Sequence, residues 1–213
     1  MKKAILITAI CLFSLTMASG QATKLGAMIG PNLSTFPQSD GGQVTSSSVL
    51  GVHLGVFTEF AFGRLSIEPG LFYAVIGGTA NSVDTYGAGG TSTDTYNLQY
   101  LQVPVNFLYN TPDRKFFFGG GPYIGFGLSG HETDNISDGS FFGGPPSMET
   151  IDKKFIFNGT NNPDFGFNIL AGVHLKGGTI FTVSYGVGRK YDGGLYSSEG
   201  NNVFGISIGH TIL

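Results

Sequence analysis

The chain has 213 residues, of which 35 are glycine, 19 are phenylalanine and only 12% are charged, with no tryptophan and a formal net charge of -3. Helical bundles do not have such a composition, and a nucleic-acid-binding protein would need a basic stripe of Lys and Arg that this sequence lacks. The glycine and aromatic excess, in short alternating runs separated by Gly, Pro, Asn and Asp, favours a single all-β domain.

The first residues are typical of a secretory signal. Two lysines precede an apolar run over residues 4–17, and small residues follow it. A retained membrane anchor is the alternative, but the run is shorter than the roughly 18 to 20 residues that a spanning helix requires. We therefore predict that residues 1–22 form a signal peptide and that the chain is exported.

Cleavage after Gly20 or Ala22 would leave residues 23–213 as the mature domain. Cys11, the only cysteine, lies inside the predicted signal. The mature chain is therefore expected to have no disulfide framework and no catalytic cysteine.

Alternation with a period of two residues predicts eight strands in the mature chain. They cover residues 23–36, 49–62, 64–76, 96–109, 115–129, 164–176, 178–188 and 202–213. Long and short connections alternate between them. The long ones are 37–48, 77–95, 130–163 and 189–201, and the short ones are Gly63, 110–114 and 176–178.

This alternation favours an eight-stranded antiparallel up-and-down transmembrane β-barrel, because every second connection of such a barrel lies at the same end. Bacterial outer-membrane barrels have short periplasmic turns and long extracellular loops, so both termini are predicted to be periplasmic. The long connections are rich in Gly, Ser, Thr and Asp, as solvated loops are, and a hairpin near residues 151–157 is expected to extend the third one.

The side-chain pattern predicts which face of each strand meets lipid. In the fourth strand Leu101, Val103 and Val105 share one parity, whereas Gln102 and Asn106 share the other, and a strand sends the two sets to opposite faces. The predicted lipid-facing rows include Leu50, Val52, Leu54, Val56, Leu65, Ile67, Leu71, Tyr73, Val75, Phe107, Tyr109, Phe116, Phe118, Pro122, Ile124, Phe126, Leu128, Phe165, Phe167, Ile169, Ala171, Val173, Leu175, Phe181, Val183, Tyr185, Val187, Phe204, Ile206 and Ile208. No charged residue interrupts them.

The opposite parity is predicted to face the lumen. It contains many glycines, Phe117, Tyr123 and Ser129, and the polar residues Lys24, Asn32, His53, Glu59, Glu68, Gln102, Asn106, Asn168, His174 and Lys176. Eight strands enclose just enough space for side chains, so we expect a filled polar interior and no open channel. A secreted soluble barrel of the lipocalin type is the structural alternative, but its exterior would carry more charge than this row offers.

The sequence resembles the PorT-like outer membrane β-barrel family of Bacteroidetes over nearly the whole mature chain. The resemblance rests on the order of six segments: KLGAMIGPNLS from Lys24, IEPGLFY from Ile67, YLQVPVNFLY from Tyr100, GGGPYIGFGL from Gly119, DFGFNILAG from Asp164, and the closing FGISIGHTIL. It implies an eight-stranded barrel that the outer-membrane assembly machinery inserts into the outer membrane. The family is named for a member linked to type IX secretion.

Together these features predict an integral, non-enzymatic outer-membrane protein that acts through extracellular loops or contacts with envelope proteins, including secretion proteins. The alternative is a small-ligand carrier or narrow pore. No nucleic-acid partner and no cofactor are expected.

No catalytic, cofactor or metal site is predicted. His53 and His174 could ligate a metal with Glu59 or Glu68, but no close zinc-type ligand spacing is present, and packed lumen histidines are the favoured interpretation. Ser184 with His174 has no recognisable hydrolase spacing.

Three further features receive structural interpretations. The segment 134–139, DNISDG, lacks the ligand pattern of an EF-hand and is interpreted as an exposed acidic turn. Gly119 to Gly121, Gly125 and Gly127 precede no helix, so they are interpreted as small lumen residues instead of a phosphate-binding loop. The aromatic and histidine side chains expected in the interfacial girdle are Tyr73, Tyr109, Tyr185 and His210.

Overall fold

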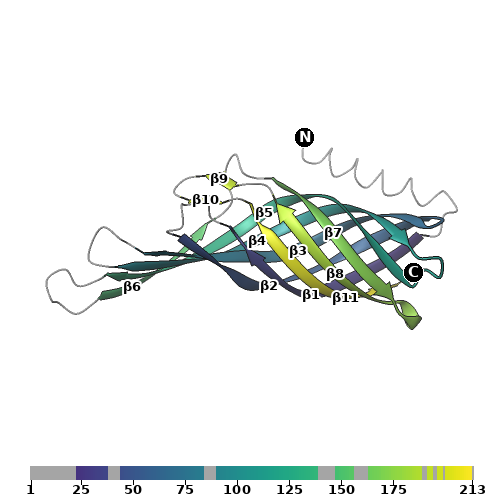
Figure 1. The fold of residues 1–213 in the computed structure, drawn as a ribbon, viewed down its shortest axis with the longest axis horizontal. Coiled ribbons are helices and arrows are strands. Elements are labelled where there is room, and N and C mark those ends of the chain that lie inside the picture. Colours follow the sequence, from purple (N-terminus) through teal and green to yellow (C-terminus); the bar gives the residue numbers. More distant parts are fainter. Residues whose placement is uncertain are drawn as a thin grey trace.

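The computed structural model describes residues 23–37, 44–83, 90–138, 147–155, 163–188, 191–193, 196–198 and 200–212. Its strands are β1 (Thr23–Thr35), β2 (Val44–Phe62), β3 (Leu65–Val83), β4 (Thr91–Asn110), β5 (Phe116–Asp138), β6 (Ser147–Phe155), β7 (Asp164–His174), β8 (Thr179–Gly188), β9 (Tyr191–Gly193), β10 (Tyr196–Ser198) and β11 (Asn202–Thr211) (Figure 1). Among these residues, no helix is long and apolar enough to cross a membrane. The predicted signal peptide lies outside the described residues.

Antiparallel pairing closes eight of the strands into a barrel. The ring runs β1-β2-β3-β4-β5-β7-β8-β11, and β11 returns to pair with β1, placing Leu33 opposite Phe204 and Ile29 opposite Ile208. Each strand of the ring therefore has a hydrogen-bonding neighbour on both sides. The predicted fold class is confirmed.

One end of the barrel holds the short connections. The β2–β3 turn, the β4–β5 turn and the β7–β8 turn lie there, together with the start of β1 and the end of β11, where Gly26 pairs with Thr211 (Figure 1). The turns use glycine where the backbone is left-handed, with φ of 65° at Gly63, 78° at Gly177 and 81° at Gly178. Glycine adopts this conformation without the penalty that a Cβ would add.

The apolar parity faces outward, as the sequence predicts. Leu50, Ile169 and Val183 have exposed fractions of 69%, 55% and 47%, although they are aliphatic. On the opposite parity Glu59 and Glu68 are buried. The molecule is therefore apolar outside and partly polar inside, which reverses the arrangement of a water-soluble barrel.

Four strands are longer than predicted. β2 begins at Val44 and β4 at Thr91, whereas β3 ends at Val83 and β5 at Asp138, so the loops predicted over 37–48, 77–95 and 130–163 are too long. The reason is that Ser, Thr and Asn, which favour turns locally, here make cross-strand bonds instead. The hairpin expected near 151–157 is present as β6, and the loop predicted over 189–201 contains the short β9–β10 pair.

Two lumen assignments at strand ends are wrong. Lys176 does not continue β7 but lies exposed in the 3-10 turn Lys176–Gly178, because the chain reverses there through two left-handed glycines. In β5 a bulge at Leu128 brings Ser129 opposite Gln99, and the two side chains bond on the exposed outer face at 2.8 Å. A bulge reverses the parity of the residues that follow it.

A charge placed mid-strand on the outer face tests this arrangement. We expect Val183→Arg to lower the free energy of unfolding in lipid vesicles by about 2–4 kcal/mol, whereas Leu65→Arg at the edge of the barrel is expected to cost about 0–1 kcal/mol. Urea unfolding of both variants measures the difference. An equally small cost at both positions would contradict an outward-facing apolar surface in lipid.

Candidate functional site: barrel interior and strand extension

An apolar cluster fills the lumen near the short-turn end. Phe57, Leu108, Phe117 and Ile180 are at most 4% exposed, and Met28, Phe72 and Leu170 pack against them. The sequence gives a partial signal for this cluster, since aromatic residues occupy both parities in FTEFAF and KFFF. The predicted polar interior is therefore only partly correct.

Glycines make room for the inward-facing aromatic rings. A Cβ added at Gly26 would collide with the Phe57 ring, and one added at Gly172 would collide with the Phe117 ring. A Cβ added at Gly166 would likewise collide with the Tyr123 ring. The high glycine and phenylalanine contents thus have a common cause, because large rings fit inside a narrow barrel only where the neighbouring strand lacks side chains.

A charged network lies beside this cluster. The Glu59 side chain is 3% exposed and forms ion pairs of 3.2 Å with both Lys24 and Arg114. Ser66 donates a 2.7 Å hydrogen bond to the same carboxylate. Arg114 has a φ of 52°, an unusual value for a residue with a Cβ, and its position in the β4–β5 turn directs its guanidinium to Glu59.

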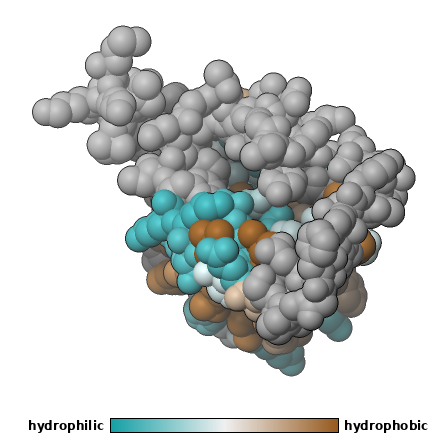
Figure 2. Space-filling view, turned by 90° about the vertical axis from the view of Figure 1, so that its left-hand side faces the viewer, coloured by the Kyte–Doolittle hydropathy of each residue, from teal (hydrophilic) through white to brown (hydrophobic). Residues whose placement is uncertain are grey.

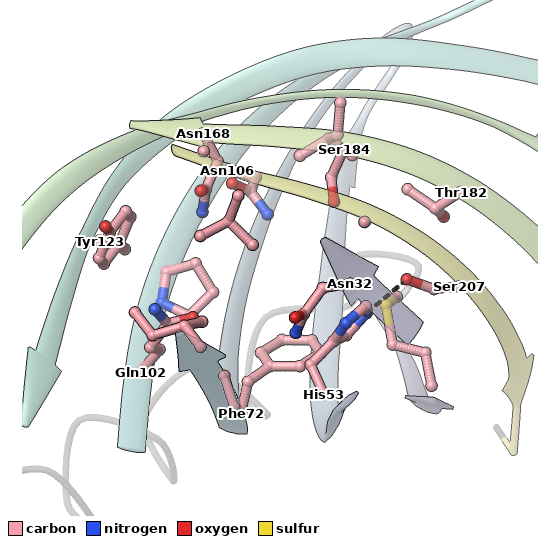
Figure 3. A pocket seen from close by; sticks show the side chains of 18 of the residues that line it. Asn32, His53, Phe72, Gln102, Asn106, Tyr123, Asn168, Thr182, Ser184 and Ser207 are labelled. Carbon is pink, nitrogen blue, oxygen red and sulfur yellow. Dashed lines mark hydrogen bonds between the residues drawn. The ribbon is translucent and has the colours of Figure 1, made fainter. Parts of the chain in front are cut away.

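A cavity of about 100 Å³ occupies the middle of the lumen, among residues that include Asn32, His53 and Glu68. Within it His53 Nε2 and Ser207 Oγ are 2.7 Å apart, and Asn106 donates a 3.4 Å bond to Glu68. Figure 3 shows Asn106 and Asn168 on one wall and the His53–Ser207 pair on another. Binding pockets for drug-sized ligands measure about 300–1,000 Å³, so this space suits a few water molecules.

A second group of side chains lies farther from the short turns. Ala74, Ile76 and Tyr100 are at most 6% exposed and contact Leu98 and Val203. Near them Tyr123 donates a 3.3 Å bond to Asn201, which donates one of 3.2 Å to Asp164. The cavity is therefore bordered by packed side chains toward both ends of the barrel.

Five strands continue beyond the barrel as an antiparallel sheet, here called the strand extension. It consists of residues 44–48 of β2, 78–83 of β3, 91–97 of β4, 130–138 of β5 and 147–155 of β6. In Figure 1 it projects past the barrel at the end opposite the short turns. Figure 2 views the molecule from that end, where hydrophilic side chains predominate among the described residues.

The outer face of the strand extension carries small polar side chains in rows that cross the strands. Thr79 and Thr95 lie 3.3 Å apart through their hydroxyls, Thr93 donates to Asn81 at 3.0 Å, and Thr150 donates to Asn135 at 2.9 Å. These bonds explain why a serine- and threonine-rich segment forms strands. Because these bonds depend on the register between neighbouring strands, sequence periodicity within one strand did not reveal them.

The inner face of the strand extension carries two buried acidic side chains. Asp94 and Asp134 lie opposite each other on β4 and β5 and are 4% and 7% exposed. Lys153 Nζ lies 2.7 Å from Asp134 Oδ2, and this contact raises the pKa of Lys153 because the carboxylate stabilises the ammonium form. Lys153 thereby offsets part of the repulsion between the two carboxylates.

Comparison with known proteins places the chain in a family. Residues 19–201 match the model of the outer membrane protein beta-barrel domain. The chain belongs to this family. Membership gives an outer-membrane location and identifies the exposed apolar rows as the lipid-facing surface, while the narrower PorT-like assignment stays a prediction.

Solved outer-membrane barrels are similar in fold. The attachment invasion locus protein Ail of Yersinia pestis is 12% identical, with a TM-score of 0.43 over 89% of this chain and 98% of that one. Neisserial surface protein A is 9% identical, with a TM-score of 0.40 over 88% and 97% of the two chains. The translocator domain of NalP from Neisseria meningitidis is 12% identical, with a TM-score of 0.32 over 97% and 95%. No curated protein matches the chain.

In this outer-membrane barrel, the histidines and the serine considered as metal ligands or catalytic residues lie in separate places. His53 bonds to Ser207, and the His174 ring packs against Phe117 in a tilted arrangement with centroids 4.8 Å apart, so both are packed lumen histidines as predicted. The described residues include no group of three His, Cys, Asp or Glu that could hold a metal. His174 pairs with Ile180, which is four residues or about 13 Å from Ser184 along β8, so these two residues do not form a hydrolase pair.

The remaining interpretations have mixed outcomes. The acidic turn predicted at 134–139 is wrong over its described part, because Asp134 is a buried residue of β5 and the strand continues to Asp138. Gly119 and Gly121 do face the interior, where a Cβ would collide with the backbone of β4. The lumen assignment of Gly120 is wrong, because it lies opposite the outward-facing Phe107 and Ile169.

The candidate girdle residues lie on or near the outer surface. Tyr109 and Tyr185 are 37% and 40% exposed, His210 is exposed, and Tyr73 is partly exposed. Their interfacial role stays a prediction.

The charged network supplies a stability test. Glu59→Gln would leave Lys24 and Arg114 without their shared carboxylate. Because those side chains are about one-third exposed, we expect a loss of about 1–3 kcal/mol, below the full cost of breaking a buried pair. Glu149→Gln on exposed β6 is the control and is expected to cost under about 0.5 kcal/mol. Urea unfolding followed by gel migration measures both, and equal values would exclude a structural role for this network.

Proposed function

We propose that this protein is a non-enzymatic outer-membrane barrel that acts through its strand extension and the neighbouring loops, by contact with other molecules of the envelope or cell surface. The strand extension carries this proposal. It offers an exposed, hydrogen-bonded polar face that the barrel does not require for closure.

The filled interior supports a role outside the lumen. Phe57 and Phe117 pack across the lumen on one side of the cavity, and Ile76 and Tyr100 pack on the other. Moving a solute through the barrel would require these clusters to separate. The described side chains thus favour a closed barrel over a pathway.

Both termini of the barrel domain are proposed to be periplasmic, with the strand extension outside the cell. The support comes from the short turns, because outer-membrane barrels keep short connections on the periplasmic side and longer ones outside. The turn at Gly63 and the turn at Gly177 lie at the end that holds the start of β1.

Cysteine labelling tests this orientation. The mature chain is expected to lack cysteine, so single variants can be compared without background. Glu149→Cys on β6 should react with a membrane-impermeant maleimide in intact cells, whereas Thr111→Cys in the β4–β5 turn should react only after the outer membrane is permeabilised. The reverse pattern would refute the proposed orientation.

A small-ligand carrier or narrow pore is the second candidate, and the central cavity, which Asn32, His53 and Glu68 help to line, favours it. With the packed clusters on both sides, we expect no discrete conductance steps from the purified protein in planar bilayers. Phe57→Ala, Phe117→Ala and Tyr100→Ala together remove large rings from both packed clusters and are expected to produce steps. Stable steps from the unmodified protein would support a pore instead.

A narrower proposal is that the barrel assists the type IX secretion apparatus. It rests on the sequence resemblance to the PorT-like family alone. A deletion strain that still secretes type IX cargo at the normal rate would remove it.

A further inference from the structure

The outer face of the strand extension is continuous with the lipid-facing surface of the barrel. On β4 the outward parity runs from Val103 and Leu101 through Gln99 to Asn97 and Thr95 without interruption. On β5 the bulge at Leu128 preserves this register, because Ser129 then lies opposite Gln99 on the outside. A lipid molecule beside the barrel therefore meets one surface that changes in chemistry with height.

The height of each row follows from strand geometry. Two residues along a strand tilted by about 40° rise by roughly 5 Å, so Asn97 lies about 10 Å above Leu101. The next two outward positions on β4, Thr95 and Thr93, lie about 15 Å and 20 Å above it. The polar headgroup layer of a bilayer begins where the hydrocarbon ends and adds about 5–8 Å on each side.

The first complete row above the apolar surface carries one lysine and one histidine and is here called the basic row. It consists of Asn97, His131 and Lys154, which are opposite one another on β4, β5 and β6. Lys154 and His131 are exposed, whereas the neighbouring Lys153 turns to the inner face and binds Asp134. Asp152, in the next row up, lies 3.7 Å from His131.

Two polar rows lie above the basic row. The lower polar row is Ser47, Thr79, Thr95, Thr133 and Asp152, and the upper polar row is Thr45, Asn81, Thr93, Asn135 and Thr150. Nine of these ten side chains are uncharged. Each hydroxyl has one donor and two acceptor positions, so those paired across the strands keep capacity for a second partner.

We propose that this face docks the phosphorylated glycolipid of the outer leaflet. Lys154 and His131 contact lipid phosphate, and the two polar rows above them contact the sugars. Two observations identify this lipid as the occupant. The face is continuous with the lipid-facing surface, and its rows follow the order of the lipid's parts: the apolar rows match acyl chains, the basic row matches phosphates and the hydroxyl rows match sugars. The inference rests on the proposed function, since it needs the strand extension to lie outside the cell.

Binding of fluorescent lipopolysaccharide to the purified, detergent-solubilised protein tests the inference. We expect Lys154→Gln to weaken binding about fivefold, a typical contribution of one basic residue at a lipid surface, and Lys154→Arg to retain it. Asp152→Asn should tighten binding about twofold, because it removes the negative charge beside His131. A dephosphorylated probe should show no difference between the protein and Lys154→Gln.

The matched control is Lys115→Gln, the same charge change at an exposed residue of the opposite end. It should leave binding unchanged. Equal losses in Lys115→Gln and Lys154→Gln would overturn the inference, because binding would then follow net charge alone. Heat-modifiable gel migration verifies that each variant forms the closed barrel.

The polar rows have their own test. Thr95→Val combined with Thr133→Val keeps the shape and strand preference of both residues but removes two hydroxyls, and it should weaken binding of lipopolysaccharide about five- to tenfold. Unchanged binding would exclude the sugar contacts.

The inference and the proposed function fail in different ways. Both ends of the barrel are accessible in detergent, so this assay does not depend on orientation. Absence of specific binding with Glu149→Cys labelled from outside overturns the inference alone. Labelling of Glu149→Cys only after permeabilisation overturns the proposed function, and with it an outer-leaflet occupant.

Discussion

In a bilayer, every backbone N–H and C=O group needs a hydrogen-bond partner within the protein, and the fold depends on this requirement. An open sheet would leave two edges unpaired in hydrocarbon, where each missing hydrogen bond costs several kcal/mol. Pairing of β1 with β11 removes both edges, and the alternating connections follow from this antiparallel closure. At the other end the strand extension does not close, which is compatible with water but not with lipid.

Closure also determines the composition of the chain. A ring of eight strands leaves a narrow lumen, and large side chains enter it only where a neighbouring strand has glycine, as at Phe117 and Gly172. A charged side chain lies inside the barrel where opposite charges pair with it, as Glu59 does with Lys24 and Arg114. Glycine, phenylalanine and a few ion pairs thus together fill the barrel, and the aliphatic residues remain for the lipid-facing surface.

The strict alternation of apolar residues made the barrel predictable from sequence, because rows such as Leu50 to Val56 face outward in the fold, as their sequence pattern predicts. Strand length was less predictable, because the segment Val44 to Ser48 has the composition of a loop and forms a strand only through cross-strand bonds. The Glu59–Arg114 pair joins residues 55 positions apart. Such contacts, like the fit of ring against glycine, depend on the register between strands, which periodicity within one strand does not determine.

The central claim, that this outer-membrane barrel is apolar toward lipid and packed within, is tested most directly by methyl NMR in lipid nanodiscs. Cross-relaxation from lipid acyl chains should reach the methyl groups of Leu50, Ile169 and Val183, which are outward and exposed, but not those of Ile76, Leu108 and Ile180, which are buried inside. All six side chains are aliphatic, so position alone distinguishes the sets. Acyl-chain contacts to the inner set, with none to the outer set, would contradict the account.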